Sequence, residues 1–333
     1  MVHLLAVGLF MLTCWQQAFA QADPQNWMRD IYGDKPDRAL RNIMIPGTHD
    51  TGTDQMTKSS SLSSTLDGVL KIAPKSAVVS WSKTQDRSML QQLQDGIRYF
   101  DLRVENTPRG WMTYHGLLSN SLTHMLEELA IFVNAHPREI VLLDFQSLVN
   151  FNNDHTALIS YLEQHPVLGP RVATWDRFNA GVRLGDLWDA DKSLILLFGQ
   201  RRVRSPDGSF GDSTFVWPRV LQNPWSNTRH TAKVEEDLMN GIRQRPTDIF
   251  YVSQGVLTPD AHVVTLGWAS GITSLRDMAV KWMNTKFAHL IPRLHDEARK
   301  AGKSVNIIIA DFYQHSPLVE LCLRFNEADA EQP

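Results

Sequence analysis

Short apolar stretches that alternate with amphipathic stretches are the feature that most limits how this chain can fold. The clearest apolar stretches are SLILLF (193–198) and SVNIIIA (304–310). Continuous apolar segments of this length are typical of parallel strands that are buried on both faces. Between such stretches, apolar residues recur at three- and four-residue intervals, as at Leu122, Met125 and Leu126. This spacing predicts surface helices, and strands that alternate with helices predict an α/β fold.

The expected strands and helices follow one another through most of the chain. Strands are expected at residues 42–45, 97–104, 139–145, 193–198, 249–254, 262–268 and 304–310. Helices are expected at residues 81–96, 121–136, 154–164, 234–245 and 275–300, the last as one helix or as two joined near Pro292. Residues 184–188 are interpreted as a short connection, and Pro46-Gly47 as a turn. No repeat or break in composition divides these segments, so we predict a single irregular (β/α) barrel of the TIM type over residues 21–333.

Length and composition agree with this architecture. The chain has 333 residues, of which 43% are hydrophobic and 21% are charged. These values are ordinary for a soluble globular domain, and a large α/β barrel fits within this length. The net charge is −3 and no basic run stands out, so nucleic-acid binding has no electrostatic support. Nothing in the composition indicates a particular oligomeric state.

Residues 1–20 have the pattern of a signal peptide. Residues 4–13 are apolar, and Ala-Phe-Ala at 18–20 supplies the small-x-small pattern before a cleavage site. We therefore expect this leader to be removed and the mature chain to be secreted. A retained membrane anchor is the alternative, because no Lys or Arg precedes the apolar run. Removal of Cys14 would leave Cys322 as the single cysteine, which excludes an internal disulfide.

Titratable side chains follow several of the expected strands directly. His49 and Asp50 follow the first strand and its Pro-Gly turn, Asp311 follows the last strand, and His115 ends a further short strand. Because the carboxyl ends of parallel strands meet at one mouth of a barrel, where barrel active sites lie, we expect these side chains to converge. For His49 and Asp50 alone, a histidine satisfied in a structural turn is the alternative.

Two charged residues lie inside the strand expected at residues 97–104. Asp101 and Arg103 are two residues apart, so their side chains lie on the same face of that strand. Either they form a buried ion pair that supports the barrel mouth, or they jointly bind an anion.

The stretch 53–78 is rich in Ser, Thr, Lys and Gly and shows little periodicity. Long loops of this kind are often functional. It either forms one wall of a substrate cleft next to His49 or is a disordered insert.

These side chains form the set that phosphodiester cleavage requires. The reaction needs a base for the attacking hydroxyl, an acid for the leaving oxygen and a cation for the phosphoryl oxygens. Two histidines tuned by carboxylates, His49 and His115, can supply the first two functions near neutral pH. Arg103 can supply the third through bidentate contact.

Three motifs in this order, IPGTHDTGT, GIRYFDLRVE and YHGL, resemble the X domain of phosphatidylinositol-specific phospholipases C (PI-PLC). The pattern is similar to that of the PI-PLC X-domain-containing proteins in particular. It also includes VVSWSKTQ, HPREIVLLDFQ and the region of Trp217-Pro218 and Pro224-Trp225. The resemblance covers nearly the whole mature chain, and it implies a catalytic barrel of the PI-PLC X-domain type.

The resemblance implies a role for each residue of the acid–base pair. His49 resembles the general base that takes the proton of the inositol 2-hydroxyl, and Asp311 the carboxylate that orients it. His115 resembles the general acid for the diacylglycerol oxygen. Attack by the 2-hydroxyl would expel diacylglycerol and leave a cyclic inositol phosphate, which water could open afterwards.

Arg103 determines what the resemblance implies about metals. Asp50 would pair with Arg103 and assist the acid, and Asp101 would help to hold the arrangement. Calcium-dependent relatives place a carboxylate where Arg103 stands and an asparagine where Asp50 stands, whereas metal-independent bacterial enzymes resemble the pair seen here. We therefore expect no required metal or other cofactor; a calcium site at Asp101 and Asp144 is the alternative.

The resemblance is weaker where the headgroup would be chosen, and Arg201 and Tyr313 are the candidates for substrate binding. The leading prediction is a secreted, metal-independent phosphodiesterase that acts on phosphatidylinositol or its glycosylated (GPI) anchors and contacts a membrane surface transiently. One alternative is a barrel enzyme that cleaves another phosphodiester, such as a glycerophosphodiester or sphingomyelin. The other is a protein that binds a lipid headgroup without turnover.

Overall fold

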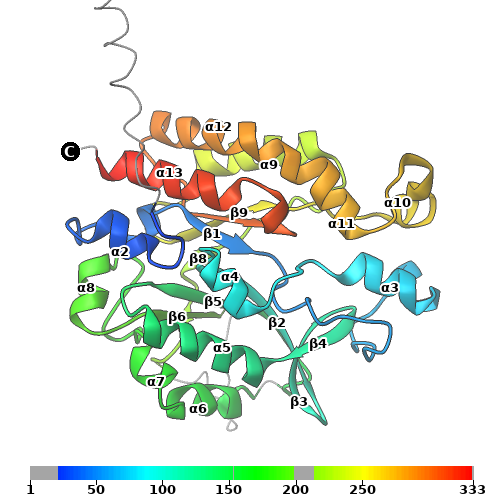
Figure 1. Cartoon of the computed structure of the whole chain (residues 1–333), viewed down its shortest axis with the longest axis horizontal. Helices are drawn as coiled ribbons and strands as arrows, with labels where there is room; N and C mark the ends of the chain where they lie inside the picture. The colour runs from blue at the N-terminus through cyan, green and yellow to red at the C-terminus, as the bar shows by residue number, and fades with distance from the viewer. Residues whose placement is uncertain (1–21, 153, 199–213, 332–333) are drawn as a thin grey trace, which may run out of the picture.

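The computed structural model describes residues 22–152, 154–198 and 214–331 (Figure 1). The expected signal peptide, residues 1–20, and the candidate Arg201 lie outside these ranges. Within the described ranges, no helix combines the length and the apolar character that crossing a membrane requires.

A sheet of ten strands forms the centre of the molecule. Its main path runs in the order β7, β6, β5, β2, β1, β10, β9, β8. These strands are β1 (Ile45–Thr48), β2 (Tyr99–Thr107), β5 (Val141–Val149), β6 (Leu194–Phe198), β7 (Trp217–Pro218), β8 (Leu221–Gln222), β9 (Phe250–Gly255) and β10 (Ile307–Ala310). Every ladder along the path is parallel. Two further strands, β3 (Gly110–His115) and β4 (Leu117–Ser121), extend β2 as an antiparallel flap.

The chain itself joins the two ends of this path. Only Arg219 and Val220 separate β7 from β8. Three steps of about 3.8 Å between consecutive Cα atoms therefore limit the distance between the two strand ends to roughly 11 Å. The sheet must curl until its first and last strands are neighbours, although the described residues form no ladder between them. The result is a barrel with one open seam.

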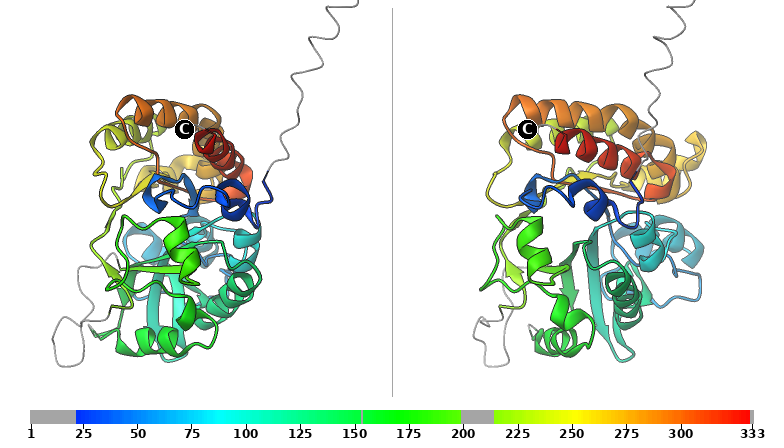
Figure 2. Two further views of the ribbon diagram at one scale, coloured as in Figure 1. Left: turned by 90° about the vertical axis from the view of Figure 1, so that its left-hand side faces the viewer. Right: turned by 60° about the vertical axis from the view of Figure 1, so that its left-hand side comes forward.

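Helices cover the outside of the curled sheet. The longer helices are α5 (Leu122–Ala135), α9 (Thr231–Gln244), α12 (Phe287–Lys300) and α13 (Leu318–Ala330). The shorter helices are α2 (Trp27–Tyr32), α3 (Lys75–Ser82), α4 (Met89–Gln94), α6 (Thr156–Gln164), α7 (Leu168–Arg171), α8 (Leu184–Asp189), α10 (Ala261–Leu266) and α11 (Leu275–Met278). Figures 1 and 2 show α9, α12 and α13 together on one side of the sheet and α5, α6 and α7 on the opposite side.

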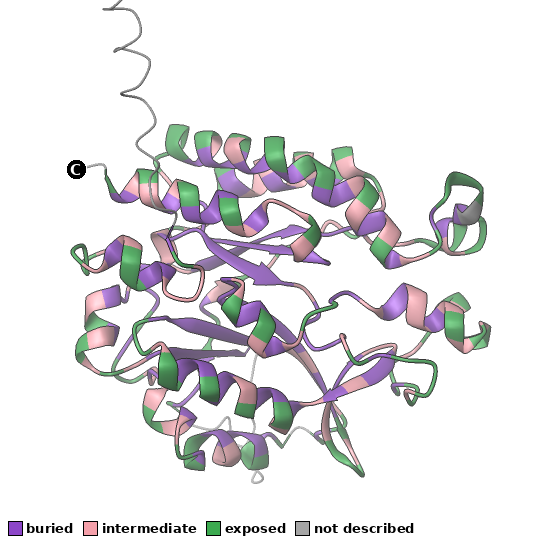
Figure 3. Cartoon of the chain, viewed as in Figure 1, coloured by how far each residue is buried: buried purple, intermediate pink, exposed green. Residues whose placement is uncertain are grey.

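Two separate cores lie on the two faces of the sheet, because strand side chains alternate in direction. Phe100 and Leu143 pack with residues of the covering helices. Their chain neighbours Tyr99 and Leu142 belong instead to the core inside the barrel, which α2 also joins. The strands are buried on both faces while the outer faces of the helices are exposed (Figure 3). Polar side chains follow the carboxyl ends of β1 and β10, so the mouth at that end is where a site inside the barrel can form.

The Pro-Gly pair of the first strand is not the expected turn. Pro46 and Gly47 lie within β1, which pairs with β10 on one side and with β2 on the other. The ring of Tyr99 lies against Gly47, where a Cβ atom would come within 2.8 Å of Tyr99 Cδ1. A glycine inside a strand often marks such a close approach, and here it makes room for an aromatic ring inside the barrel.

Two further element predictions are wrong. Residues 184–188 form most of α8, which begins where Asp186 accepts a hydrogen bond from the Arg183 N–H (3.0 Å). Residues 262–268 are helical rather than extended, because Asp260 caps α10 by accepting from the Val263 N–H (2.9 Å). The segment 275–300 is helical throughout, as expected, although it passes through a π-helical stretch (Ala279–Met283) and a 3₁₀ stretch (Asn284–Lys286) before α12, which contains Pro292.

Candidate active site

His49 and Asp50 lie immediately beyond the carboxyl end of β1, in a sharp turn. Asp50 has a φ of 45°, in the left-handed region that non-glycine residues seldom adopt. The Thr51 N–H then donates to the Asp101 carbonyl (2.8 Å), so the chain is fixed against β2 as it leaves the strand. The hydroxyls of Thr48 and Thr51 lie 2.7 Å apart and brace the same turn. This backbone holds both titratable side chains at the mouth of the barrel.

The imidazole of His49 lies between a carboxylate and a guanidinium. Its Nδ1 is 2.8 Å from Asp311 Oδ1, beyond the end of β10, and its Nε2 is 3.2 Å from Nη2 of Arg103. Because the carboxylate can only accept, Nδ1 carries the proton, and Nε2 of the neutral ring is left as the acceptor. The side chain is 12% exposed, so this nitrogen is accessible in a largely desolvated setting.

His115 ends β3 and faces the same carboxylate from the flap. Its Nδ1 donates to the Ser82 carbonyl of α3 (2.7 Å), and its Nε2 is 3.4 Å from Asp50 Oδ2. The Nε2 of His49 is also 3.4 Å from Asp50 Oδ2, and the two imidazole centroids are 6.4 Å apart. Gly116 allows this approach, because a Cβ atom there would lie 2.7 Å from the Ser82 hydroxyl. Both nitrogens of His115 face acceptors, an arrangement that suits an imidazolium.

Arg103 pairs with Asp50 rather than mainly with Asp101. Its Nε forms an ion pair with Asp50 Oδ1, whereas its Nη2 is 3.8 Å from Asp101 Oδ2. The guanidinium side chain is 33% exposed, and the two carboxylates beneath it are almost fully buried. Arg103 therefore forms its ion pair chiefly with Asp50, and its exposed part leaves N–H groups facing the mouth.

The pKa values of His49 and Asp50 depend on the charged groups around them. Burial alone would lower the pKa of His49, but Asp50 and Asp311 outweigh it and raise the pKa to about 9. Burial alone would raise the pKa of Asp50, but Arg103, His115 and His49 outweigh it and lower the pKa to about 2. At neutral pH the free site thus holds an ionised Asp50 and a largely protonated His49.

Proteins of known name match this chain over nearly its whole length. PI-PLC X domain-containing protein 3 of Mus musculus is 29% identical over 329 residues, which cover 92% of this chain and 95% of the relative. The protein of the same name from Homo sapiens is 28% identical over 321 residues, with 90% and 93% covered. PI-PLC X domain-containing protein 2 of Mus musculus is 27% identical over 301 residues, with 86% and 83% covered. No family model matches the chain.

The predicted resemblance to the PI-PLC X-domain proteins is confirmed.

Solved structures of PI-PLC share the fold. A Staphylococcus aureus PI-PLC superposes with a TM-score of 0.62 at 17% identity, covering 91% of this chain and 98% of that chain. The Listeria monocytogenes PI-PLC has a TM-score of 0.59 at 19% identity, with the same coverage of 91% and 98%. The expected α/β barrel of the TIM type is therefore confirmed.

Two acidic residues lie inside the barrel, beneath the two histidines. Asp101 and Asp144 are register partners in the ladder between β2 and β5, and both are buried. Asp144 Oδ2 accepts from the Tyr99 hydroxyl (2.5 Å) and from Gln146 Nε2 (2.6 Å). Burial raises the pKa of Asp144 to about 7 and also raises the pKa of Asp101. This layer forms the floor of the mouth.

One group of ligand atoms in the described residues is close enough to hold a metal. His49, Asp50 and Asp101 each offer an atom within 4.8 Å of the others. The guanidinium of Arg103 forms an ion pair with Asp50 and lies near Asp101, so a fixed positive charge already occupies the anionic side of this group. That charge would repel a divalent cation placed among these atoms.

Of the two candidates for substrate binding, Tyr313 is not part of this cluster. The Tyr313 hydroxyl donates to Asp95 Oδ2 (2.7 Å), and the side chain is 2% exposed within the core under the helices. The Tyr313 hydroxyl is therefore already hydrogen-bonded inside the protein. Arg201 lies outside the described residues.

Two residues of the site escaped the sequence analysis, Ser82 and Gln85. The Ser82 backbone carbonyl orients His115, and the Gln85 amide donates to the carbonyls of His49 and Ala310 (2.9 Å each). Both belong to VVSWSKTQ, a segment of the family pattern. That match was the available signal, but a role played by a backbone carbonyl has no side-chain signature.

Proposed function

We propose that this protein is a phosphodiesterase of the PI-PLC type, which cleaves phosphatidylinositol to diacylglycerol and a cyclic inositol phosphate. One observation carries the proposal: His49 and His115 approach the same carboxylate oxygen of Asp50 from two sides, and Arg103 lies against that carboxylate. A base, an acid and a cation thus surround one small volume at the mouth of the barrel. These are the three functions that phosphodiester cleavage by an internal hydroxyl requires.

The reaction begins with the phosphate next to the exposed side of Arg103. His49 Nε2 takes the proton of the inositol 2-hydroxyl, and the oxygen attacks phosphorus. As the new P–O bond forms, the bond to the diacylglycerol oxygen breaks, and His115 Nε2 gives its proton to that oxygen. Each proton transfer is worth roughly 10²- to 10⁴-fold in rate. Arg103 stabilises the charge on the phosphoryl oxygens throughout.

The reactive form of the site, whose share grows as the pH approaches the His49 pKa of about 9, has the two histidines in complementary states. Asp311 holds the Nδ1 proton of His49, so that Nε2 can act as the base, and the Arg103 N–H toward Nε2 favours the neutral ring. Asp50 faces Nε2 of His115, where the transferable proton resides. After the first step the histidines have exchanged states, and the reverse exchange allows water to open the cyclic phosphate.

The proposal requires no divalent metal, because Arg103 supplies positive charge where a metal would act. GPI anchors carry the same phosphodiester and belong to the same substrate class. The apolar run at residues 4–13 supports a secreted protein.

Contact with a membrane surface is part of the proposal, because the substrate is a lipid. Six large apolar side chains are exposed among the described residues, and five of them lie in connections that follow the carboxyl end of a strand. They are Leu62, Val69 and Ile72 after β1, Trp225 after β8 and Leu266 after β9. In Figure 1, β1 points toward the edge of the molecule where α3 and α10 lie. Apolar side chains around a mouth favour insertion into a lipid surface.

The test is an assay with phosphatidylinositol vesicles in the presence of EDTA, followed by phosphorus NMR. We expect a cyclic inositol phosphate from the parent protein and almost none from His49→Ala or His115→Ala. Intact lipid after incubation with the folded parent would contradict the proposal, and so would turnover that is the same in all three proteins. Activity that returns only when Ca²⁺ is added would contradict metal independence alone.

A further inference from the structure

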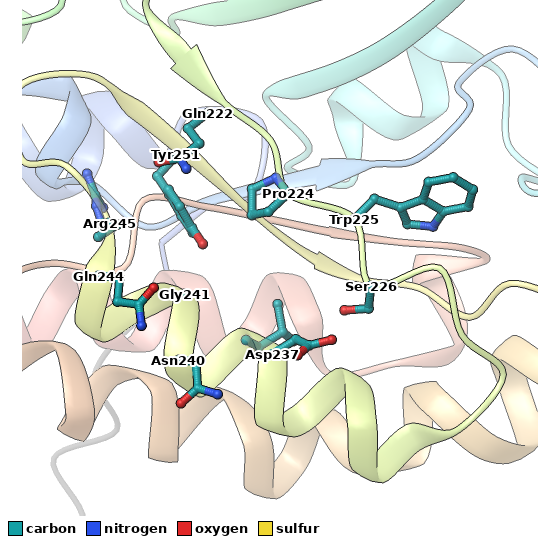
Figure 4. A pocket seen from close by; sticks show the side chains of 11 residues that line it. Gln222, Pro224, Trp225, Ser226, Asp237, Asn240, Gly241, Gln244, Arg245 and Tyr251 are labelled. Carbon is teal, nitrogen blue, oxygen red and sulfur yellow. The ribbon is translucent and has the colours of Figure 1, made fainter.

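A polar groove lies outside the barrel, between α9 and the segment that follows β8. It encloses about 290 Å³, at the lower end of ligand-site volumes, so its occupant would be small. One wall is the segment from Gln222 to Ser226, and the other is one face of α9 (Figure 4). None of the six residues of the proposed active site lines it.

The hydroxyl of a largely buried tyrosine points into the groove. Tyr251 is 4% exposed and lines the groove, yet its hydroxyl makes no hydrogen bond within the described part of the chain. Figure 4 shows the ring directed from β9 toward the turn of α9 that holds Gly241. A Cβ atom on Gly241 would lie 2.2 Å from this hydroxyl oxygen. A glycine inside a helix costs about 1 kcal/mol relative to alanine, and here it leaves the hydroxyl room in the groove.

The helix wall presents side chains that both donate and accept hydrogen bonds. Asp237, Asn240 and Gln244 follow one another at three- and four-residue spacing, so they share one face of α9. Asp237 accepts from Lys233 Nζ (2.6 Å) and Asn240 from Arg243 Nη1 (2.8 Å), each through one oxygen. The amide of Gln244 has no hydrogen-bond partner among the described side chains or backbone. Amides and a carboxylate in a row suit a ligand with several hydroxyl groups.

The opposite wall ends in an exposed aromatic ring. Trp225 is 56% exposed, and its Nε1–H donates to the Thr258 hydroxyl (2.9 Å), which fixes the indole at the edge of the groove. A flat apolar face beside hydrogen-bonding groups matches the two faces of a sugar ring, one of C–H groups and one of hydroxyls.

The charge of the groove selects a neutral ligand. Arg245 is the one cation that lines it in the described residues, and it is 3% exposed. Its guanidinium donates to the backbone carbonyls of Pro246, Ser304 and Ile249. No cation is therefore free for a phosphate or carboxylate ligand, while Asp237 would repel one.

From these observations we infer that the groove of α9 is a binding site for a neutral sugar ring, separate from the catalytic site. The hydroxyl of Tyr251 and the amide of Gln244 bind ring hydroxyls, and Trp225 contacts the C–H face. The ring comes either from a free sugar or from the end of a glycan chain. The inference does not depend on the proposed reaction.

Saturation-transfer difference NMR on the purified full chain tests this site. The probes are mannose, glucose and galactose as free rings, and mannotriose as a glycan. We expect transfer to at least one probe, with Tyr251→Phe and Gln244→Ala each raising its Kd about three- to tenfold, the effect of one hydrogen bond. Transfer to mannotriose without transfer to mannose assigns the site to glycans, and transfer to both assigns it to single rings.

Two control variants make the outcome decisive. Gln94→Ala makes the same change at an exposed glutamine of α4 and should bind like the parent. His115→Ala should also bind like the parent, because the catalytic site is elsewhere. The inference is overturned by absence of transfer to every probe at high millimolar concentration, by a Kd that Tyr251→Phe and Gln244→Ala leave unchanged, or by loss of binding in His115→Ala. Since the Tyr251 hydroxyl bonds to no described group, Tyr251→Phe should fold normally, and circular dichroism checks this.

Discussion

His49 and His115 face the same carboxylate but are held by different groups on their far sides. Each Nε2 lies 3.4 Å from Asp50 Oδ2. Behind the ring, His49 has the carboxylate of Asp311 at 2.8 Å, whereas His115 has the backbone carbonyl of Ser82 at 2.7 Å. Both partners fix the same tautomer, with the proton on Nδ1, but only one of them carries charge.

Because of this difference, the two histidines suit different roles, base and acid, although both contact Asp50. A carboxylate behind an imidazole strengthens it as a base, and Arg103 next to Nε2 of His49 favours the form that can accept a proton. His115 has no guanidinium within hydrogen-bonding distance of its Nε2 in the described structure, and Asp50 there stabilises a bound proton. The β1 and β10 side of the mouth therefore suits the base, and the flap of β3 suits the acid.

The largest effect is expected from removing each histidine with two different leaving groups. On phosphatidylinositol, His49→Ala and His115→Ala should each reduce kcat by roughly 10²- to 10⁴-fold. On a 4-nitrophenyl inositol phosphate, whose leaving group departs without a proton, His115→Ala should regain most of its activity while His49→Ala should not. Nitrophenolate release measured by absorbance gives both rates.

The pattern across the two substrates decides between the roles. Recovery of His49→Ala instead of His115→Ala would exchange the acid and the base. Equal losses on both substrates would mean that His115 positions the substrate and transfers no proton.

A smaller effect is expected from the group behind the base. Asp311→Asn removes the charge that supports His49, so kcat should fall by on the order of 10²-fold, and the pKa of His49 should fall because Asp311 helps to raise it. The matched control is Ser82→Ala, which keeps the backbone carbonyl behind His115 and should leave kcat nearly unchanged. Wild-type activity in Asp311→Asn would show that the carboxylate is dispensable.

The convergence of the six candidate residues could be predicted because four are polar side chains at the carboxyl end of a strand and two are charged side chains on one face of a strand. His49, Asp50 and Asp311 follow their strands directly. The partners that distinguish the two histidines were harder to foresee. Ser82 acts through its backbone, and its position depends on how α3 folds back over the flap. Such contacts arise from tertiary packing, which has no local pattern in the sequence.

In the fold, too, local patterns could be predicted from the sequence and tertiary contacts could not. Parallel strands were predicted from continuous apolar stretches, whereas Pro46-Gly47 was wrongly expected to end the first strand. The reason for Gly47 lies in Tyr99, a residue of the neighbouring strand whose ring occupies the space of a Cβ atom. Tyr313 was a candidate for the mouth, but its hydroxyl contacts Asp95. A phenol after a strand carries no sign of which direction it takes.

The pH dependence of the reaction should follow the base. With the pKa of His49 raised to about 9 by Asp50 and Asp311, the neutral fraction grows with pH up to that value. The value of kcat/KM should therefore rise about tenfold per pH unit on the acid side and level off near the pKa. Initial rates in buffers of constant ionic strength measure this limb. A rate that falls over the interval in which His49 loses its proton would make it an acid.

The same raised pKa makes stability depend on pH. Because the folded pKa of about 9 lies above the ordinary value of 6.5, His49 contributes stability that is fully present below about 6.5 and is lost as the pH rises through about 9. Thermal melts of the parent and of His49→Ala should therefore converge as the pH rises through this window. A constant difference between their melting temperatures would contradict the shift.

Two aspartates on the inner face of the barrel should respond in opposite ways to loss of charge. Asp50 has its pKa lowered to about 2, so its ionised form adds stability above about 3.8 that is lost as the pH falls through about 2. Asp50→Asn should therefore destabilise the protein at neutral pH by on the order of 3 kcal/mol, because Arg103 loses its partner. Urea titration at several pH values measures this loss.

Asp144 has its pKa raised to about 7, so the folded state binds an extra proton and stability falls as the pH rises from about 3.8 to about 7. Asp144→Asn removes this cost and keeps an oxygen for the Tyr99 hydroxyl, so its melting temperature should exceed that of the parent by a few degrees above neutral pH and match it in acid. If both asparagine variants were destabilised at every pH, Asp144 would be ionised and needed as a charge. The floor of the mouth would then carry a negative charge at Asp144. The raised pKa of Asp144 instead predicts that this carboxyl group is largely protonated below about pH 7.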